Sequence, residues 1–146
     1  MGFHMGDLMD DPFAQLGLPR KFELDDATLR AAAQSAGSTP AYQAIADPKQ
    51  RAETLLALMN GPSRELWRGI PPDFAAALAA AGTDAGKLAA LRQQRLTNIL
   101  HLFRQLGSND KIIVHLARQR MIRAELNALD ELAPLMPQNS NPSQIR

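Results

Sequence analysis

The stretch Tyr42–Leu58, YQAIADPKQRAETLLAL, decides the fold, because it reads as the end of one helix, a tight break and a second helix. Asp47 is a suitable N-cap, Pro48 has the φ of a first helical residue, and Gln50 stands where a capping box has Glu or Gln. Apolar residues then recur with the i, i+3, i+4, i+7 spacing of one helical face, at Ala52, Leu55, Leu56 and Met59. The sequence Asn-Gly-Pro at 60–62 ends this helix.

Similar signals on both sides of this stretch predict further helices. The other expected helices are a short turn near Pro12 and the ranges 26–36, 74–81, 84–106 and 110–132. A turn of three residues between the last two makes them antiparallel neighbours. The alternation typical of β-strands is missing from the sequence, so we predict an all-α fold.

Length and composition limit the classes of protein that this chain can represent. It has 146 residues, 45% of them hydrophobic, and no cysteine. The length suits one ordinary domain or two small helical ones. Without cysteine there are no disulfides and no cysteine ligands for a metal or an iron–sulfur cluster. No apolar run approaches the ~20 residues of a membrane span, and the acidic start is too short for a signal peptide, so we expect a cytoplasmic location and no membrane partner.

Positive charge is concentrated in residues 87–123, although the whole chain has a net charge of only +1. This segment carries eight basic residues and one acidic residue, a net charge of +7. The block has three interpretations: a solvated helix face, a docking surface for an acidic protein, or a contact to a nucleic-acid backbone. The candidate binding residues are Arg92, Arg95, Arg104, Arg118 and Arg120. Aromatic residues do not alternate with them, which argues against base stacking.

The sequence contains no catalytic or cofactor motif: it has no phosphate-binding loop, no dinucleotide fingerprint and no cysteine nucleophile. We therefore expect neither an enzymatic activity nor a cofactor. His101 and His115 would lie level in a tight hairpin, but a third ligand is missing nearby, so we do not predict a metal site. The single tryptophan, Trp67, is expected to pack at a junction rather than to form a binding platform.

Short stretches near both ends of the chain resemble one protein family. The sequence AYQAIADPKQRAE at 41–53 resembles the end of the third helix and the start of the fourth in a J-domain, the module of DnaJ-type co-chaperones. Its extension to Leu56 and the sequence DPFAQLGLP at 11–19 are similar to the HscB branch, which serves iron–sulfur cluster assembly. The sequence ARQRMIRAEL at 117–126 is similar to the last helix of the three-helix C-terminal domain of HscB proteins.

The resemblance implies an all-α protein in which a shortened J-domain-like part packs with a C-terminal three-helix, HscB-like bundle. The expected parts are a disordered N-terminus at 1–9, a degenerate J-like domain at 10–61, a linker at 62–70, the bundle at 71–133 and a disordered tail at 134–146. The tail is rich in Pro, Asn and Ser, a composition typical of disorder.

The centre of a working J-domain has no counterpart in this sequence. In that family a long basic helix leads into a loop with the tripeptide His-Pro-Asp, which triggers the ATPase of a DnaK-type chaperone. Here only residues 31–40 lie between the matching ends, and none of the three histidines precedes a proline. We therefore predict that this protein does not stimulate such an ATPase.

These observations lead to the hypothesis of a non-catalytic protein-interaction module related to the HscB co-chaperones. The partners that the resemblance implies are an iron–sulfur scaffold protein and a DnaK-type chaperone. The candidate contact residues, which match family contacts in type or lie on the matching helices, are Phe74, Leu78, Met121 and Ile122. The alternative hypothesis is a basic helical hairpin that binds nucleic acid or an acidic protein. The oligomeric state stays open.

Overall fold

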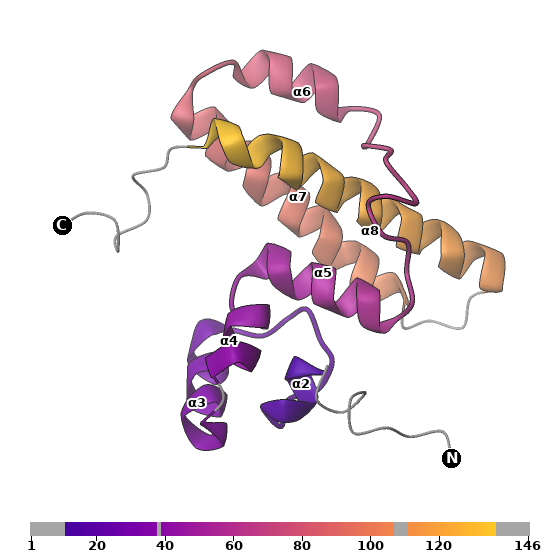
Figure 1. The fold of residues 1–146 in the computed structure, drawn as a ribbon. Helices are drawn as coiled ribbons and strands as arrows, with labels where there is room; N and C mark the ends of the chain where they lie inside the picture. The colour runs from indigo at the N-terminus through magenta and orange to yellow at the C-terminus, as the bar shows by residue number, and fades with distance from the viewer. Residues whose placement is uncertain (1–10, 38, 107–110, 137–146) are drawn as a thin grey trace.

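The structure of this protein is a computed structural model that describes residues 11–37, 39–106 and 111–136 (Figure 1). Over these ranges the chain is helical and contains no strand, which confirms the predicted all-α fold. The elements are α2 (Pro12–Gln15), α3 (Asp26–Ala36), α4 (Thr39–Ile45), α5 (Pro48–Leu58), α6 (Phe74–Ala81), α7 (Ala85–Leu106), α8 (Ile112–Leu132) and the 3₁₀ turn η1 (Ala133–Leu135).

Aspartate caps begin three of these helices. The side chain of Asp11 accepts a hydrogen bond from the Ala14 N–H, that of Asp25 from Thr28, and that of Asp47 from the Gln50 N–H at 3.1 Å. A cap of this kind satisfies one of the N–H groups left without a partner in the first turn and stabilises a helix by about 1 kcal/mol. The cap predicted at Asp47 is therefore confirmed.

The end of α5 also follows from its sequence. Asn60 has a φ of 60°, and Gly61 lies so close to the side chain of Leu56 that a Cβ would have no room there. Only a residue without a side chain allows the chain to leave the helix along this path. The Asn-Gly-Pro sequence thus turns the chain sharply into the linker at 62–70.

The buried Arg51 fixes the break between α4 and α5. Its guanidinium donates hydrogen bonds to the backbone carbonyls of Ile45 at 2.9 Å, Ala46 at 3.1 Å and Phe22 at 2.8 Å. The same group lies 5.6 Å from the centre of the Phe22 ring. One side chain therefore supplies hydrogen-bond donors to the free carbonyl groups at the end of α4, and it also attaches the segment before α3 to α5.

Helix α5 belongs to two hydrophobic cores. On one side, Leu55 packs with residues of α2, α3 and α4, among them Phe13 and Leu29. On the other side, Ala52 and Leu56 pack with α7 and α8 in a core that contains Leu96, Ile99, Leu102, Ile122, Leu126 and Leu129. Burial of a leucine stabilises the fold by about 1.5–3 kcal/mol. The helix that we assigned to the J-like part is thus also a component of the C-terminal bundle.

Helices α7 and α8 lie side by side and antiparallel, and α6 covers one end of the pair (Figure 1). Phe74 and Ala81 of α6 pack with Leu88 of α7 and Leu132 of α8 in a third core. The bounds of α6 agree with the prediction, whereas α8 begins at Ile112 and the predicted turn before it lies outside the described residues.

The rest of the predicted domain organisation is only partly covered by the described residues. Residues 1–9 and 137–146, predicted to be disordered, lie outside them. The first residues of the predicted tail, 134–136, belong to or directly follow η1. A packing like that of HscB proteins remains a prediction.

We predict that Arg51→Ala destabilises the protein by at least about 2 kcal/mol, because it leaves three carbonyl groups without their charged donor. Urea denaturation followed by circular dichroism measures this change. Arg30→Ala is the control, since Arg30 is an exposed arginine of the adjacent helix α3. Equal stability of the two variants would contradict the role assigned to Arg51.

Candidate functional site

An apolar groove with a volume of about 530 Å³ runs between α8 and the linker that joins α5 to α6. Its volume falls within the roughly 300–1,000 Å³ typical of ligand sites. One wall is a stripe of α8, and the other is formed by Trp67, Ile70, Pro71 and Pro72. In Figure 1 this linker crosses over α8 on its way to α6. We take this groove, the α8–linker groove, as the candidate site.

The α8 wall follows from the helical period. Ala117, Met121 and Ala124 line the groove at i, i+4 and i+7, so they lie on one face of the helix. Met121 is 53% exposed, a high value for a large apolar side chain. Ile113 lies one turn before Ala117 on this face and is also exposed. The opposite face of α8 carries the core residues, so this helix is apolar on two sides.

The linker wall is held in place by the buried Asn127 of α8. Its Nδ2 donates to the carbonyl oxygens of Trp67 at 2.8 Å and Gly69 at 2.9 Å. Its Oδ1 accepts a hydrogen bond from Nε of Arg123 at 3.1 Å, and Arg123 in turn forms a two-bond ion pair with Glu53 of α5. Because all of these groups have partners, the position of the linker relative to α8 is well defined.

Trp67 forms the rim of this wall and is 37% exposed. The guanidinium carbon of Arg120 lies 5.1 Å from the centre of its ring, a distance that permits a cation–π interaction. Trp67 is thus packed on one side and open to the groove on the other. The prediction that Trp67 packs at a junction describes its covered side, but it does not describe the side that is open to the groove.

A second ion-pair system closes the far end of the groove. Arg95 of α7, only 1% exposed, donates to Asp73 at 2.8 Å and to Glu125 at 3.3 Å, and both carboxylates line the groove. It also lies against the Phe74 ring, so it joins the start of α6 to both long helices. Among the described residues, Nε of Arg95 is the one buried side-chain nitrogen or oxygen without a hydrogen-bond partner.

The two carboxylates respond differently to this arginine. Hydrogen bonding to Arg95 lowers the pKa of Asp73, which is largely exposed. Burial raises the pKa of Glu125, although the positive charge of Arg95 works in the opposite direction. The groove therefore contains a fixed negative charge at Asp73 and a buried carboxyl group whose ionised form is disfavoured.

The structure separates the predicted contact residues into two kinds. Phe74 and Ile122 are 0% exposed, because both side chains pack in the cores, so the structure gives a partner no access to either side chain. Leu78 is half-buried on α6 and does not line the groove. Met121 is the member of the set that does.

The predicted basic face is likewise not a single surface. Arg95 is buried in the bridge just described, Arg104 forms a two-bond ion pair with Glu23, and Arg92 lies 3.5 Å from Asp47. Arg118 donates to the carbonyl of Gln105. Arg120 contacts Trp67 instead. The contacts of Arg92, Arg95 and Arg104 arise because α7 packs against acidic residues that are distant in the sequence, so the positive charge of the segment is divided among several partners.

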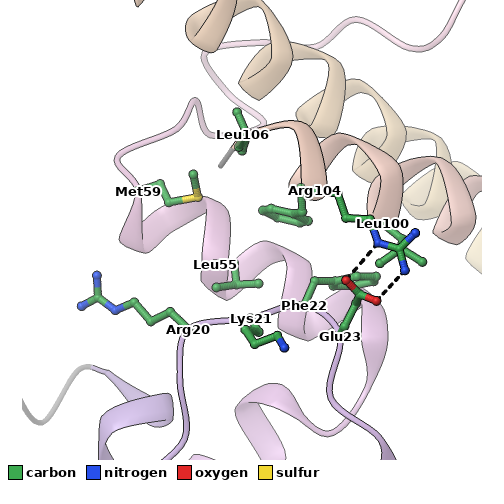
Figure 2. Close-up of a pocket in the computed structure, with 10 residues that line it drawn as sticks. Arg20, Lys21, Phe22, Glu23, Leu55, Met59, Leu100, Arg104 and Leu106 are labelled. Carbon is green, nitrogen blue, oxygen red and sulfur yellow. Dashed lines mark hydrogen bonds and ion pairs between the residues drawn. The ribbon is translucent and has the colours of Figure 1, made fainter. Parts of the chain in front are cut away.

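A smaller groove of about 300 Å³ lies between residues 20–23 and the helices α5 and α7 (Figure 2). Figure 2 shows Glu23 and Arg104 facing each other across one side of it, while Leu55 and Met59 of α5 lie beside it. Phe22 stacks on Phe103 at a centroid distance of 5.6 Å. These contacts join the N-terminal helices to α7, and we interpret this groove as part of that joint.

The histidine and carboxylate side chains of the described residues do not form a candidate metal centre. No group of three or more His, Asp or Glu side chains is arranged to hold a metal within the described ranges. His115 contacts Gln119 at 3.4 Å and is not paired with His101. None of the helices described is long and apolar enough to cross a membrane. Comparisons with protein-family models, curated proteins and solved structures find no match.

Sequence reasoning did not identify Asn127 or Arg123. A signal was present: Gln119, Arg123 and Asn127 recur every four residues and form a polar stripe beside the core of α8. All three are buried, and each one bonds to a group outside α8. A regular polar stripe next to an apolar face can therefore indicate a helix that holds another segment of the chain.

We predict that Asn127→Asp destabilises the protein by about 1–3 kcal/mol and shifts the Trp67 fluorescence to longer wavelength. The new side chain keeps the size of Asn but cannot donate to the two linker carbonyls. Thermal unfolding and the emission spectrum of the single tryptophan measure the two effects. Gln94→Glu, an exposed change on α7 with the same change in charge, is the control. An unchanged spectrum in Asn127→Asp would contradict its role in holding the linker.

Proposed function

We propose that this chain is a non-catalytic protein-interaction module that binds a partner in the α8–linker groove. The observation that carries the proposal is the exposed apolar pair of Met121 on the α8 wall and Trp67 on the linker wall, which hydrogen bonds from Asn127 hold against α8. Fixed apolar and aromatic side chains in a concave surface are the usual centre of a protein-binding site. Methionine adds a flexible and polarisable contact that adapts to a partner.

The position of the arginines favours this proposal over the nucleic-acid alternative. A backbone-binding surface needs several free cations aligned along phosphates. Arg92, Arg95 and Arg104 instead contact carboxylates of the chain itself. The alternative therefore loses most of the candidate residues on which it depended.

The sequence resemblance to HscB-type co-chaperones nominates the first partner to test, an iron–sulfur scaffold protein. Met121 lies in the stretch that resembles the last helix of that family, and it is the candidate contact residue that lines the groove. In this proposal the chain holds a protein and contributes no ligand to a cluster, in keeping with the absence of cysteine.

We predict that Met121→Asp weakens binding of a purified iron–sulfur scaffold protein at least about tenfold, since a charge in an apolar contact must be desolvated. Isothermal titration calorimetry measures the affinity. Ile112→Asp is the matched control, because Ile112 is an exposed aliphatic residue of the same helix that does not line the groove. Equal affinities of the two variants would show that the groove is not the binding site.

We also predict that the protein does not raise the single-turnover ATPase rate of a DnaK-type chaperone. The reason is that the His-Pro-Asp loop is absent and only ten residues, 31–40, occupy the corresponding region. A co-chaperone with an intact J-domain, assayed in parallel, verifies that the chaperone is competent. Stimulation by the present chain would contradict this part of the proposal.

A further inference from the structure

We infer that the occupant of the α8–linker groove is an amphipathic helix of the partner, with an acidic residue beside its apolar face that pairs with Arg120. This inference rests on the proposed function, and it specifies the chemistry of the segment that is bound. It depends on three observations: the register of the α8 wall, the lining cation Arg120 that has no carboxylate partner among the described residues, and the ion pairs of Arg95 with Asp73 and Glu125.

The α8 wall has the register that suits a second helix. Its outward stripe of Ile113, Ala117, Met121 and Ala124 spans twelve residues, so its ends lie about 16 Å or three helical turns apart. Small residues at 117 and 124 allow the axis of a second helix to approach closely, and Ile113 and Met121 can lie between its side chains. Such helix-in-groove binding uses apolar anchors at i, i+3 or i+4, and i+7 of the bound segment.

The charge around the groove indicates whether the polar residue beside the apolar face of the partner helix is acidic or basic. Arg120 lines the groove and Arg68 lies between the lining residues Trp67 and Gly69. Both side chains are exposed, and neither forms an ion pair among the described residues, although Arg120 also lies against the Trp67 ring. The negative groups of the groove, Asp73 and Glu125, are already bound to Arg95. The unbalanced charge is therefore positive, and a carboxylate of the partner complements it.

An extended partner strand fits the site less well. Pairing with a strand requires an exposed sheet edge, and the structure contains no strand in the ranges that it describes. The linker carbonyls of Trp67 and Gly69 are also bound to Asn127 and cannot form a ladder with a second chain. A helix, whose backbone groups are satisfied internally, needs no such ladder.

Titration with designed peptides tests this inference directly. The acidic peptide is a 14-residue helix without tryptophan, with leucines along one face and glutamates beside them. The basic peptide has lysines in place of the glutamates, and the broken peptide has proline at two central positions of the acidic one. The fluorescence of Trp67 and the anisotropy of a fluorescein-labelled peptide report binding to the full chain.

We expect the acidic peptide to bind at least about tenfold more tightly than the basic and broken peptides at low salt, and the preference to fall as salt screens the charges. Arg120→Glu should abolish the preference for the acidic peptide over the basic one. Arg30→Glu should preserve it, because it changes the net charge equally at an exposed arginine of α3 outside the groove. Circular dichroism verifies that both variants are folded.

Three results would overturn the inference: equal affinities for acidic and basic peptides, undiminished binding of the broken peptide, or an unchanged preference in Arg120→Glu. Binding of no peptide, together with Met121-dependent binding of the scaffold protein, would also overturn it but leave the proposed function intact. If Met121→Asp weakens the binding of neither the peptides nor the scaffold protein, both proposals fail.

Discussion

The groove exists because Asn127 holds the linker against α8. The side-chain amide of Asn127 donates two hydrogen bonds, which fix the backbone carbonyls of Trp67 and Gly69. Nε of Arg123 in turn donates to Oδ1 of Asn127 and fixes the orientation of this amide. Buried polar groups stabilise a defined arrangement only when each has a partner. This condition is met here, so the linker forms a wall with Trp67 at its rim.

The same side chains connect the groove with the rest of the fold. Arg123 reaches Glu53 on α5, the helix that contributes to the core on each side of it. Burial raises the pKa of Glu53, but the hydrogen bonds and positive charges of Arg123 and Lys49 together outweigh this effect and lower the pKa, so the carboxyl group is ionised at neutral pH. At the other end, Arg95 joins α6, α7 and α8. The groove is therefore supported from both ends by ion pairs between helices.

Much of the fold could be predicted from the sequence, because local signals determine helices. The bounds of α3, α5, α6 and α7 were predicted nearly to the residue. The signals were aspartate caps, the Asn-Gly-Pro sequence at the end of α5 and the helical periodicity of the apolar residues. The two cores that share α5 could not be predicted in this way. Leu55 and Leu56 are neighbours on one apolar stripe, and only the packing of distant helices decides that they enter different cores.

The candidate site was predictable only in part, for a similar reason. Met121 and Ile122 are adjacent apolar residues in the same helix, and the sequence does not reveal which one faces a core and which one faces a groove. Arg95 and Arg120 contribute equally to a count of charges, yet the buried Arg95 bridges Asp73 and Glu125, whereas Arg120 lies on the Trp67 ring. Their roles depend on contacts with segments that lie more than twenty residues away in the chain.

The most direct test of the central claim, that the α8–linker groove is a preformed binding site, is a nuclear magnetic resonance titration of the labelled protein with its partner segment. Our account predicts that the largest shift changes fall on the Trp67 indole N–H, Ala117, Met121 and Ala124, with little change in α3 and α4. Changes centred on α3, or around Glu23 and Arg104, with none at Trp67, would contradict it.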